Sequence, residues 1–186
     1  MRTPALLLLL AATPAVSHPL GRDEYSLRAG IEASDEGVRV VVMGEIPIAD
    51  VITGLGKLAG GKPPTKAHQA QWTEARLDEL AKGQTVTVDG AELKLEWEPS
   101  RSALNGRAVD GFFVYVVQAA VPAPLLDDDI TLVLNDQAWT AKPMVYSADV
   151  RAKGPWKLKE SSAPSDWTSD SATRRLTVRF VKGEVE

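Results

Sequence analysis

Cysteine is absent from this chain of 186 residues, and histidine occurs only at positions 18 and 68. The lack of thiols excludes disulfide bonds, lipoprotein acylation and thiolate chemistry. No glycine-rich phosphate loop and no His-Glu-x-x-His zinc motif occurs, and no serine lies in a nucleophile-elbow sequence. A Ser/His/acid triad would have to use His18 or His68. The sequence therefore predicts a protein that is not an enzyme.

An excess of positive charge is missing too. Lysine and arginine total 21 against 25 aspartates and glutamates, which gives a formal net charge of −4. A chain with this balance has no overall basic character for nucleic acid or anionic lipid. Cations are the small partners that it favours, although the same mild acidity would serve solubility alone.

Long hydrophobic runs are missing after the first dozen residues. Residues 5–12 form an apolar run with five consecutive leucines, preceded by Arg2 and followed by Ala15-Val16-Ser17. A membrane-spanning helix needs about 20 apolar residues, so an uncleaved anchor is disfavoured. One positive charge, a short apolar run and small residues before a cleavage point are typical of a secretory signal peptide. We expect residues 1–17 to be removed, His18 to begin the mature protein, and the protein to be periplasmic or secreted.

Short segments of alternating apolar and polar residues dominate the remainder. This pattern predicts half-buried strands, and an Asp-Gly pair at 89–90 predicts a tight hairpin. The predicted fold class is mainly β, a two-sheet antiparallel sandwich of immunoglobulin-like type in a single domain over residues 18–186. The expected strands cover 25–32, 38–46, 85–88, 93–97, 112–121, 130–134, 144–150 and 176–181.

One amphipathic helix is expected as an insertion at about residues 65–82. Thr65 or Lys66 would open it, and Gly83 would stop it. The structure of the glycine-interrupted stretch 49–61 is ambiguous, and 151–173 is weakly patterned. Among the tryptophans, Trp97 is expected in the core. Trp139, Trp156 and Trp167 lie in loop-like sequence and are the candidates for exposure.

His18 is the leading candidate metal ligand. An N-terminal histidine offers its α-amine and its ring Nδ1 to one ion, and His68 could supply the third nitrogen of a histidine brace, an arrangement that suits copper. Nickel and cobalt are also compatible with nitrogen ligands. An exposed, inert His68 is the ordinary alternative. Asp127-Asp128-Asp129 could bind a hard cation such as Ca²⁺, but a solvated turn before a strand is favoured.

His18-Pro19-Leu20-Gly21, the strand beginning at Tyr25, and the segment 40–47 with its Glu-Ile-Pro end resemble a known family. They are similar to the extracytoplasmic N-terminal region of bacterial nickel/cobalt exporter-type and HupE/UreJ-type membrane proteins. In those proteins, too, a helix and a glycine, here residues 75–83, are followed by a Val-Asp-Gly hairpin, here residues 85–90. Those proteins continue into a multi-helix transport domain, whereas this chain ends at Glu186.

Three functions follow as expectations. The resemblance implies a periplasmic module that binds a transition metal or docks on a separately encoded metal-transport membrane partner, with nickel or cobalt favoured. A structural or protein-interaction β-sandwich without a metal role is nearly as well supported. A copper oxidoreductase of the histidine-brace type ranks third, because it needs both His18 and His68 on one ion.

Overall fold

The computed structural model describes residues 24–105 and 111–183, and two five-stranded sheets dominate them. Sheet A has the strand order β5-β6-β2-β1-β8, and sheet B has the order β4-β3-β7-β10-β9. The strands are β1 (Tyr25–Ser34), β2 (Gly37–Pro47), β3 (Gln84–Val88), β4 (Ala91–Leu93), β5 (Glu98–Asn105), β6 (Phe112–Pro122), β7 (Asp129–Asp136), β8 (Met144–Ala152), β9 (Trp156–Ser161) and β10 (Arg175–Lys182).

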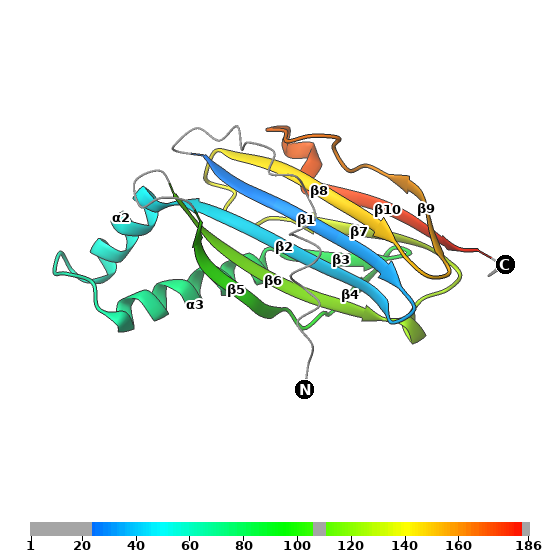
Figure 1. Ribbon diagram of the computed structural model, residues 1–186, viewed down its shortest axis with the longest axis horizontal. Coiled ribbons are helices and arrows are strands. Elements are labelled where there is room, and N and C mark those ends of the chain that lie inside the picture. The colour runs from blue at the N-terminus through cyan, green and yellow to red at the C-terminus, as the bar shows by residue number, and fades with distance from the viewer. Residues whose placement is uncertain (1–23, 106–110, 184–186) are drawn as a thin grey trace.

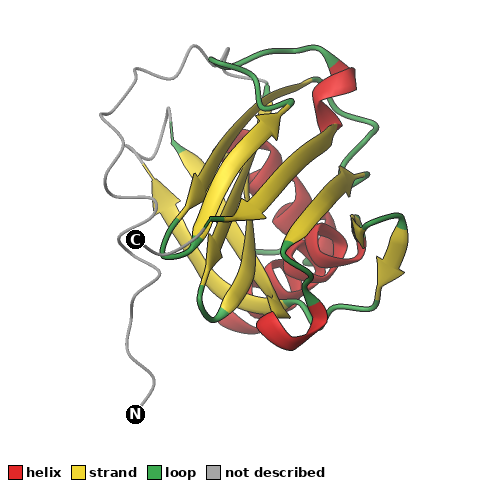
Figure 2. Ribbon diagram, turned by 90° about the vertical axis from the view of Figure 1, so that its right-hand side faces the viewer, coloured by secondary structure: helices red, strands yellow, loops and turns green. Residues whose placement is uncertain are grey.

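The sheets lie face to face, so the predicted mainly β, two-sheet sandwich is confirmed (Figures 1 and 2). Alternate residues of each strand point inward, because side chains on a strand have a period of two. Ile31, Val40 and Tyr115 of sheet A are fully buried, as are Leu132 and Phe180 of sheet B. They belong to one buried apolar cluster that both sheets share. Each such side chain contributes about 1.5–3 kcal/mol relative to an exposed position.

The sheets depart from a purely antiparallel arrangement at one place. β1 pairs with β2 in antiparallel register from Ser26 opposite Glu45, and with β8 in parallel register from Tyr25 opposite Met144. The other ladders between named strands are antiparallel. Parallel neighbours cannot be joined by a tight turn, and β1 and β8 accordingly lie far apart in the sequence.

The Asp89-Gly90 hairpin forms as predicted, with both residues at positive φ (50° and 83°) as a two-residue hairpin turn requires. The strand after it ends at Leu93 rather than at residue 97. β5 then occupies residues 98–105, where the sequence predicts no strand. β9 lies in the weakly patterned stretch 151–173, and it was missed because only Trp156 of its side chains is buried.

Two helices, rather than one, interrupt the strand order. α2 (Ile48–Leu58) follows β2 directly, and α3 (Lys66–Lys82) matches the predicted helix at 65–82. Two short 3₁₀ helices, η1 (Ala123–Leu125) and η2 (Ser171–Arg174), also occur. α2, the loop at residues 59–65 and α3 form what we call the helical hairpin, which extends from one end of the sandwich's long axis (Figure 1).

Candidate functional site

The helical hairpin is fixed to the sandwich at both ends. Pro47, the last residue of β2, precedes the first turn of α2, and the Ile48 amide donates a 3.0 Å hydrogen bond to the Gly111 carbonyl before β6. α3 starts with a capping box in which the Thr65 hydroxyl accepts from the His68 amide. At the other end Gly83 approaches Ala138 so closely that a Cβ would lie 2.5 Å from the Ala138 amide nitrogen. The hairpin is therefore anchored rather than loosely tethered.

Trp72 holds the two helices against each other and against sheet A. A Cβ added at Gly54 of α2 would lie 2.0 Å from the indole ring, so the helices meet across a glycine. The indole N–H donates a 3.0 Å hydrogen bond to the Tyr115 hydroxyl of β6. Burial raises the pKa of that Tyr115 hydroxyl to about 12. This neutral, oriented hydroxyl fixes the angle at which α3 lies on the sheet.

An apolar groove opens beside Trp72, between the helical hairpin and sheet A. It has a volume of about 1270 Å³ and is open to solvent. Its apolar walls are formed chiefly by Ile48, Val51, Ile52 and Leu55 of α2, Leu77 and Ala81 of α3, Trp97, and Phe113 and Val117 of β6. Lys66, Glu74 and Asp78 add charged groups. Ile52 is 61% exposed, which leaves apolar surface of the groove wall free for contact.

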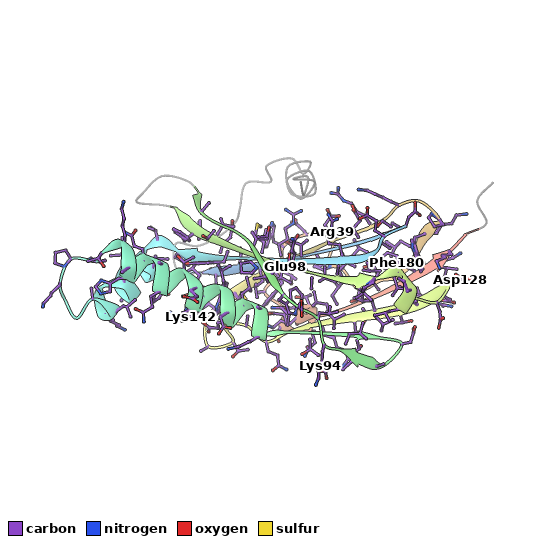
Figure 3. The ribbon with its side chains drawn as sticks, turned by 90° about the horizontal axis from the view of Figure 1, so that it is seen from below. Arg39, Lys94, Glu98, Asp128, Lys142 and Phe180 are labelled. Carbon is purple, nitrogen blue, oxygen red and sulfur yellow. The ribbon has the colours of Figure 1, made fainter. Side chains whose placement is uncertain are left out.

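A second pocket borders Trp72, and it contains a polar cluster around Asp50. Asp50 of α2 accepts hydrogen bonds from the Tyr25 hydroxyl (2.8 Å) and the Lys142 ammonium (2.7 Å). The Lys142 hydrogen bond lowers the pKa of Asp50, and Lys57 acts in the same direction. Burial, followed by the hydrogen bond to Asp50, raises the pKa of Tyr25. Lys142 lies beside the hairpin (Figure 3), so this cluster connects α2 to β1 and to the loop before β8.

A second polar cluster, around Asp136, is structural. Asp136 at the end of β7 accepts hydrogen bonds from Arg174 (2.6 Å) and from the Gln84 amide. Burial raises the pKa of Asp136 even though Arg174 opposes that shift. Arg174 also contacts the Ala138 carbonyl, so the cluster holds the turn after β7 in place. The cavity beside it is only about 30 Å³, which is too small for a ligand.

Two of the three tryptophans named as candidates for exposure are buried, so core packing, the default for tryptophan, applies to them. Trp139 is 5% exposed and Trp156 is 4% exposed. Trp139 has a positive φ of 53°, which turns its ring inward against Tyr25 and Tyr115, with a T-shaped contact of 5.7 Å to Tyr25. Trp167 is half-buried. Trp97 lies against the core, as predicted, and contributes to the groove.

The predicted metal ligands have different outcomes. His18 lies outside the described residues. His68 lies in the first turn of α3, where its Nδ1 accepts a 3.2 Å hydrogen bond from the Thr65 amide, so only its Nε2 faces away from the cap. Within residues 24–105 and 111–183, no group of three His, Cys, Asp or Glu side chains could hold a metal ion.

The three exposed aspartates at 127–129 follow the favoured interpretation of a solvated segment that leads into a strand, and Asp129 is the first residue of β7. The Asp128 carboxylate pairs with Lys182 at 2.7 Å, and Asp129 forms two hydrogen bonds with Arg179. The Arg179 hydrogen bonds lower the pKa of Asp129. Carboxylates already engaged with lysine and arginine do not form the oxygen cage that Ca²⁺ requires.

The groove is the feature that sequence reasoning missed. The sequence did contain a sign of the helix that forms one groove wall, because its apolar residues recur at the spacing of one helix face: Ile48, Val51, Ile52 and Leu55. Two glycines in the same stretch obscured that spacing, since glycine is unfavourable in a helix interior.

Comparison with known families finds no matching family model, and comparison with curated proteins finds no match. The resemblance to nickel/cobalt exporter-type and HupE/UreJ-type N-terminal regions therefore stays a prediction. No helix within the described ranges is long and apolar enough to cross a bilayer.

Proposed function

We propose that this chain is a non-catalytic periplasmic module that docks on a metal-transport membrane partner and binds an amphipathic helix of that partner in its apolar groove. The observation that carries the proposal is the open, apolar-walled groove beside Trp72. Its volume of about 1270 Å³ exceeds the ~300–1,000 Å³ of typical small-molecule pockets. A groove of this kind suits an apolar helix face, which contacts its walls at helical spacing.

The charges of the groove favour an amphipathic occupant over a wholly apolar one. Lys66 lies at the N-terminal end of α3, whereas Glu74 and Asp78 lie eight and twelve residues further along the same helix. A partner helix with acidic residues near Lys66 and basic residues near Glu74 would complement both regions. The membrane-transport character of the partner rests on the His-Pro-Leu-Gly start and the other segments that resemble the exporter family.

Metal ligation remains the second part of the proposal. His18, at the predicted mature N-terminus, would supply the α-amine and one imidazole nitrogen, and His68 would supply its Nε2. Nickel, cobalt and copper all accept such nitrogen ligands. A histidine brace would place both residues on one ion. If neither histidine binds metal, the module is a structural or protein-interaction β-sandwich, and the docking proposal still stands.

The absence of cysteine allows a clean test of docking. Ile52→Cys and Leu125→Cys each provide one thiol for a photo-crosslinker, and the two wild-type side chains are almost equally exposed, at 61% and 62%. Leu125 lies in η1, outside the groove. In the native host, the Ile52 probe should crosslink to one membrane protein, at a peptide with helical apolar spacing. Adducts of the same identity and yield from both sites would overturn the proposal.

Metal binding is tested separately. Calorimetric titration with Ni²⁺, Co²⁺ and Cu²⁺ compares the processed protein with a form that carries one extra residue before His18. We expect the extra residue to weaken binding, because it removes the free α-amine next to the imidazole. Equal affinity of the two forms would remove His18 from the role.

A further inference from the structure

The far end of the helical hairpin concentrates positive charge that the overall composition hides. Residues 51–73 contain three lysines and one histidine but no aspartate or glutamate, although acidic residues outnumber basic ones in the whole chain. Lys57, Lys62 and Lys66 lie at the end of α2, in the connecting loop and at the start of α3, and all three are exposed. We call residues 57–66 the hairpin tip.

The lysines of the hairpin tip are not neutralised by ion pairs. Within the described part of the chain, none of the three lies within ion-pair distance of a carboxylate. Lysines elsewhere do form pairs, as Lys82 does with Asp78 at 2.8 Å and Lys142 with Asp50 at 2.7 Å. At the opposite end of the molecule, where Asp128 is labelled in Figure 3, Lys182 neutralises that carboxylate. Lys57 interacts electrostatically with Asp50, but residues 57–66 contain no carboxylate, so the tip is a region of net positive charge.

The hairpin tip also presents apolar surface on a fixed backbone. Leu58 is 37% exposed between Lys57 and the loop. Gly60 and Gly61 have φ values of 62° and 78°, and the Gly61 amide donates a 3.0 Å hydrogen bond to the Gly56 carbonyl. This hydrogen bond closes the end of α2 into a turn. The tip lies at one end of the long axis, away from both sheets (Figure 1).

We propose that the hairpin tip docks this protein on the surface of a bilayer that contains anionic lipid. Clustered lysines are attracted to the negative surface potential of such a bilayer, and an exposed leucine between them enters the headgroup region. The attraction is local, because charges further away than about 10 Å are screened at ~0.1 M salt. The net charge of −4 therefore does not oppose it strongly. The inference shares one residue with the groove, Lys66, while Lys57, Lys62 and Leu58 lie outside the groove lining.

Vesicle co-flotation tests the proposal with the full chain, purified as the host processes it. The vesicles contain phosphatidylcholine alone or phosphatidylcholine with about one third phosphatidylglycerol. The tip variant carries Lys57→Gln, Lys62→Gln and Lys66→Gln. The control carries Lys94→Gln, Lys157→Gln and Lys159→Gln, which remove the same charge from exposed positions outside the hairpin. A second pair, Leu58→Ser and Leu125→Ser, tests the apolar contribution.

We expect the wild-type chain to float with anionic vesicles and not with neutral ones. Each lysine should contribute about fivefold in partitioning, so the tip variant should lose about two orders of magnitude while the control keeps most of its binding. Leu58→Ser should weaken binding, and Leu125→Ser should not. Equal loss in the tip and control variants, or equal binding to both vesicle types, would overturn the proposal. Binding to soluble polyglutamate that matches binding to vesicles would also overturn it, in favour of an acidic protein partner.

Discussion

Gly54 offers the sharpest perturbation of the helical hairpin, because α2 contains a matched control at Gly56. A Cβ at Gly54 would lie 2.0 Å from two carbon atoms of the Trp72 indole, whereas a Cβ at Gly56 would meet nothing within 4 Å. Both glycines lie inside the same helix, and neither has a positive φ. Alanine at either position therefore gains the same helix propensity, and the two variants differ in one contact.

The magnitudes follow from that contact. Replacing glycine by alanine in a helix interior stabilises by roughly 0.5–1 kcal/mol, so Gly56→Ala should raise the free energy of unfolding by that amount. Gly54→Ala must displace the indole or the helix, and such overpacking costs about 1–3 kcal/mol. We expect Gly54→Ala to be less stable than Gly56→Ala by about 1–3 kcal/mol.

Urea denaturation followed by circular dichroism measures both free energies of unfolding. The same two substitutions in a Trp72→Phe background provide the decisive comparison, because phenylalanine lacks the indole atoms that the new Cβ would meet. There the difference between the alanine variants should fall to within about 0.5 kcal/mol. If Gly54→Ala stabilises the wild-type background as much as Gly56→Ala does, the packing of α2 on Trp72 is wrong, and so is the wall of the groove.

Three further predictions concern the polar contacts around the hairpin. Tyr115→Phe removes the acceptor of a partly buried indole N–H and should destabilise by ~1–3 kcal/mol in urea denaturation; an unchanged midpoint would contradict the contact. The Lys142 hydrogen bond lowers the pKa of Asp50, so the stability that ionised Asp50 contributes is present above about pH 4 and is lost as the pH falls through the lower folded-state pKa. The stability difference between wild type and Asp50→Asn should be below about 1 kcal/mol for this half-exposed pair, and it should shrink as the pH is lowered below about 4. A pH-independent difference would refute this. Arg174→Met leaves the buried carboxylate of Asp136 without its cation and should lower the free energy of unfolding by about 3–5 kcal/mol. Adding Asp136→Asn to the same chain should partly reverse that loss, and calorimetric unfolding of the single and double variants measures both effects.

Sequence reasoning predicted the elements whose local signals agree with their burial. β1, β2, β6 and β10 alternate or are rich in valine, and α3 begins and ends at the residues that its capping signals indicated. β9 could not be predicted in this way. It is an edge strand whose side chains after Trp156 are exposed, so pairing with β10 forms it without an apolar pattern.

The candidate site was less accessible to sequence reasoning, because its parts come from distant segments. The groove joins α2, α3 and β6, and its tryptophan at position 72 meets Tyr115, which lies 43 residues further along the sequence. Trp139 was misjudged for the same reason. Its loop-like sequence gives no sign that a positive φ turns the ring against Gly44, where a Cβ would lie 2.3 Å from it.

Thiol reactivity in the native host tests the central claim, that the groove binds a partner, without knowledge of the partner's identity. Ile52→Cys and Leu125→Cys start from almost equal exposure, 61% and 62%, so their maleimide labelling rates in the purified proteins set the baseline. In intact cells of the native host, the docking proposal predicts that labelling at position 52 slows at least about tenfold relative to position 125, as expected if the site is mostly occupied. Equal relative rates in cells and in the purified proteins would contradict it.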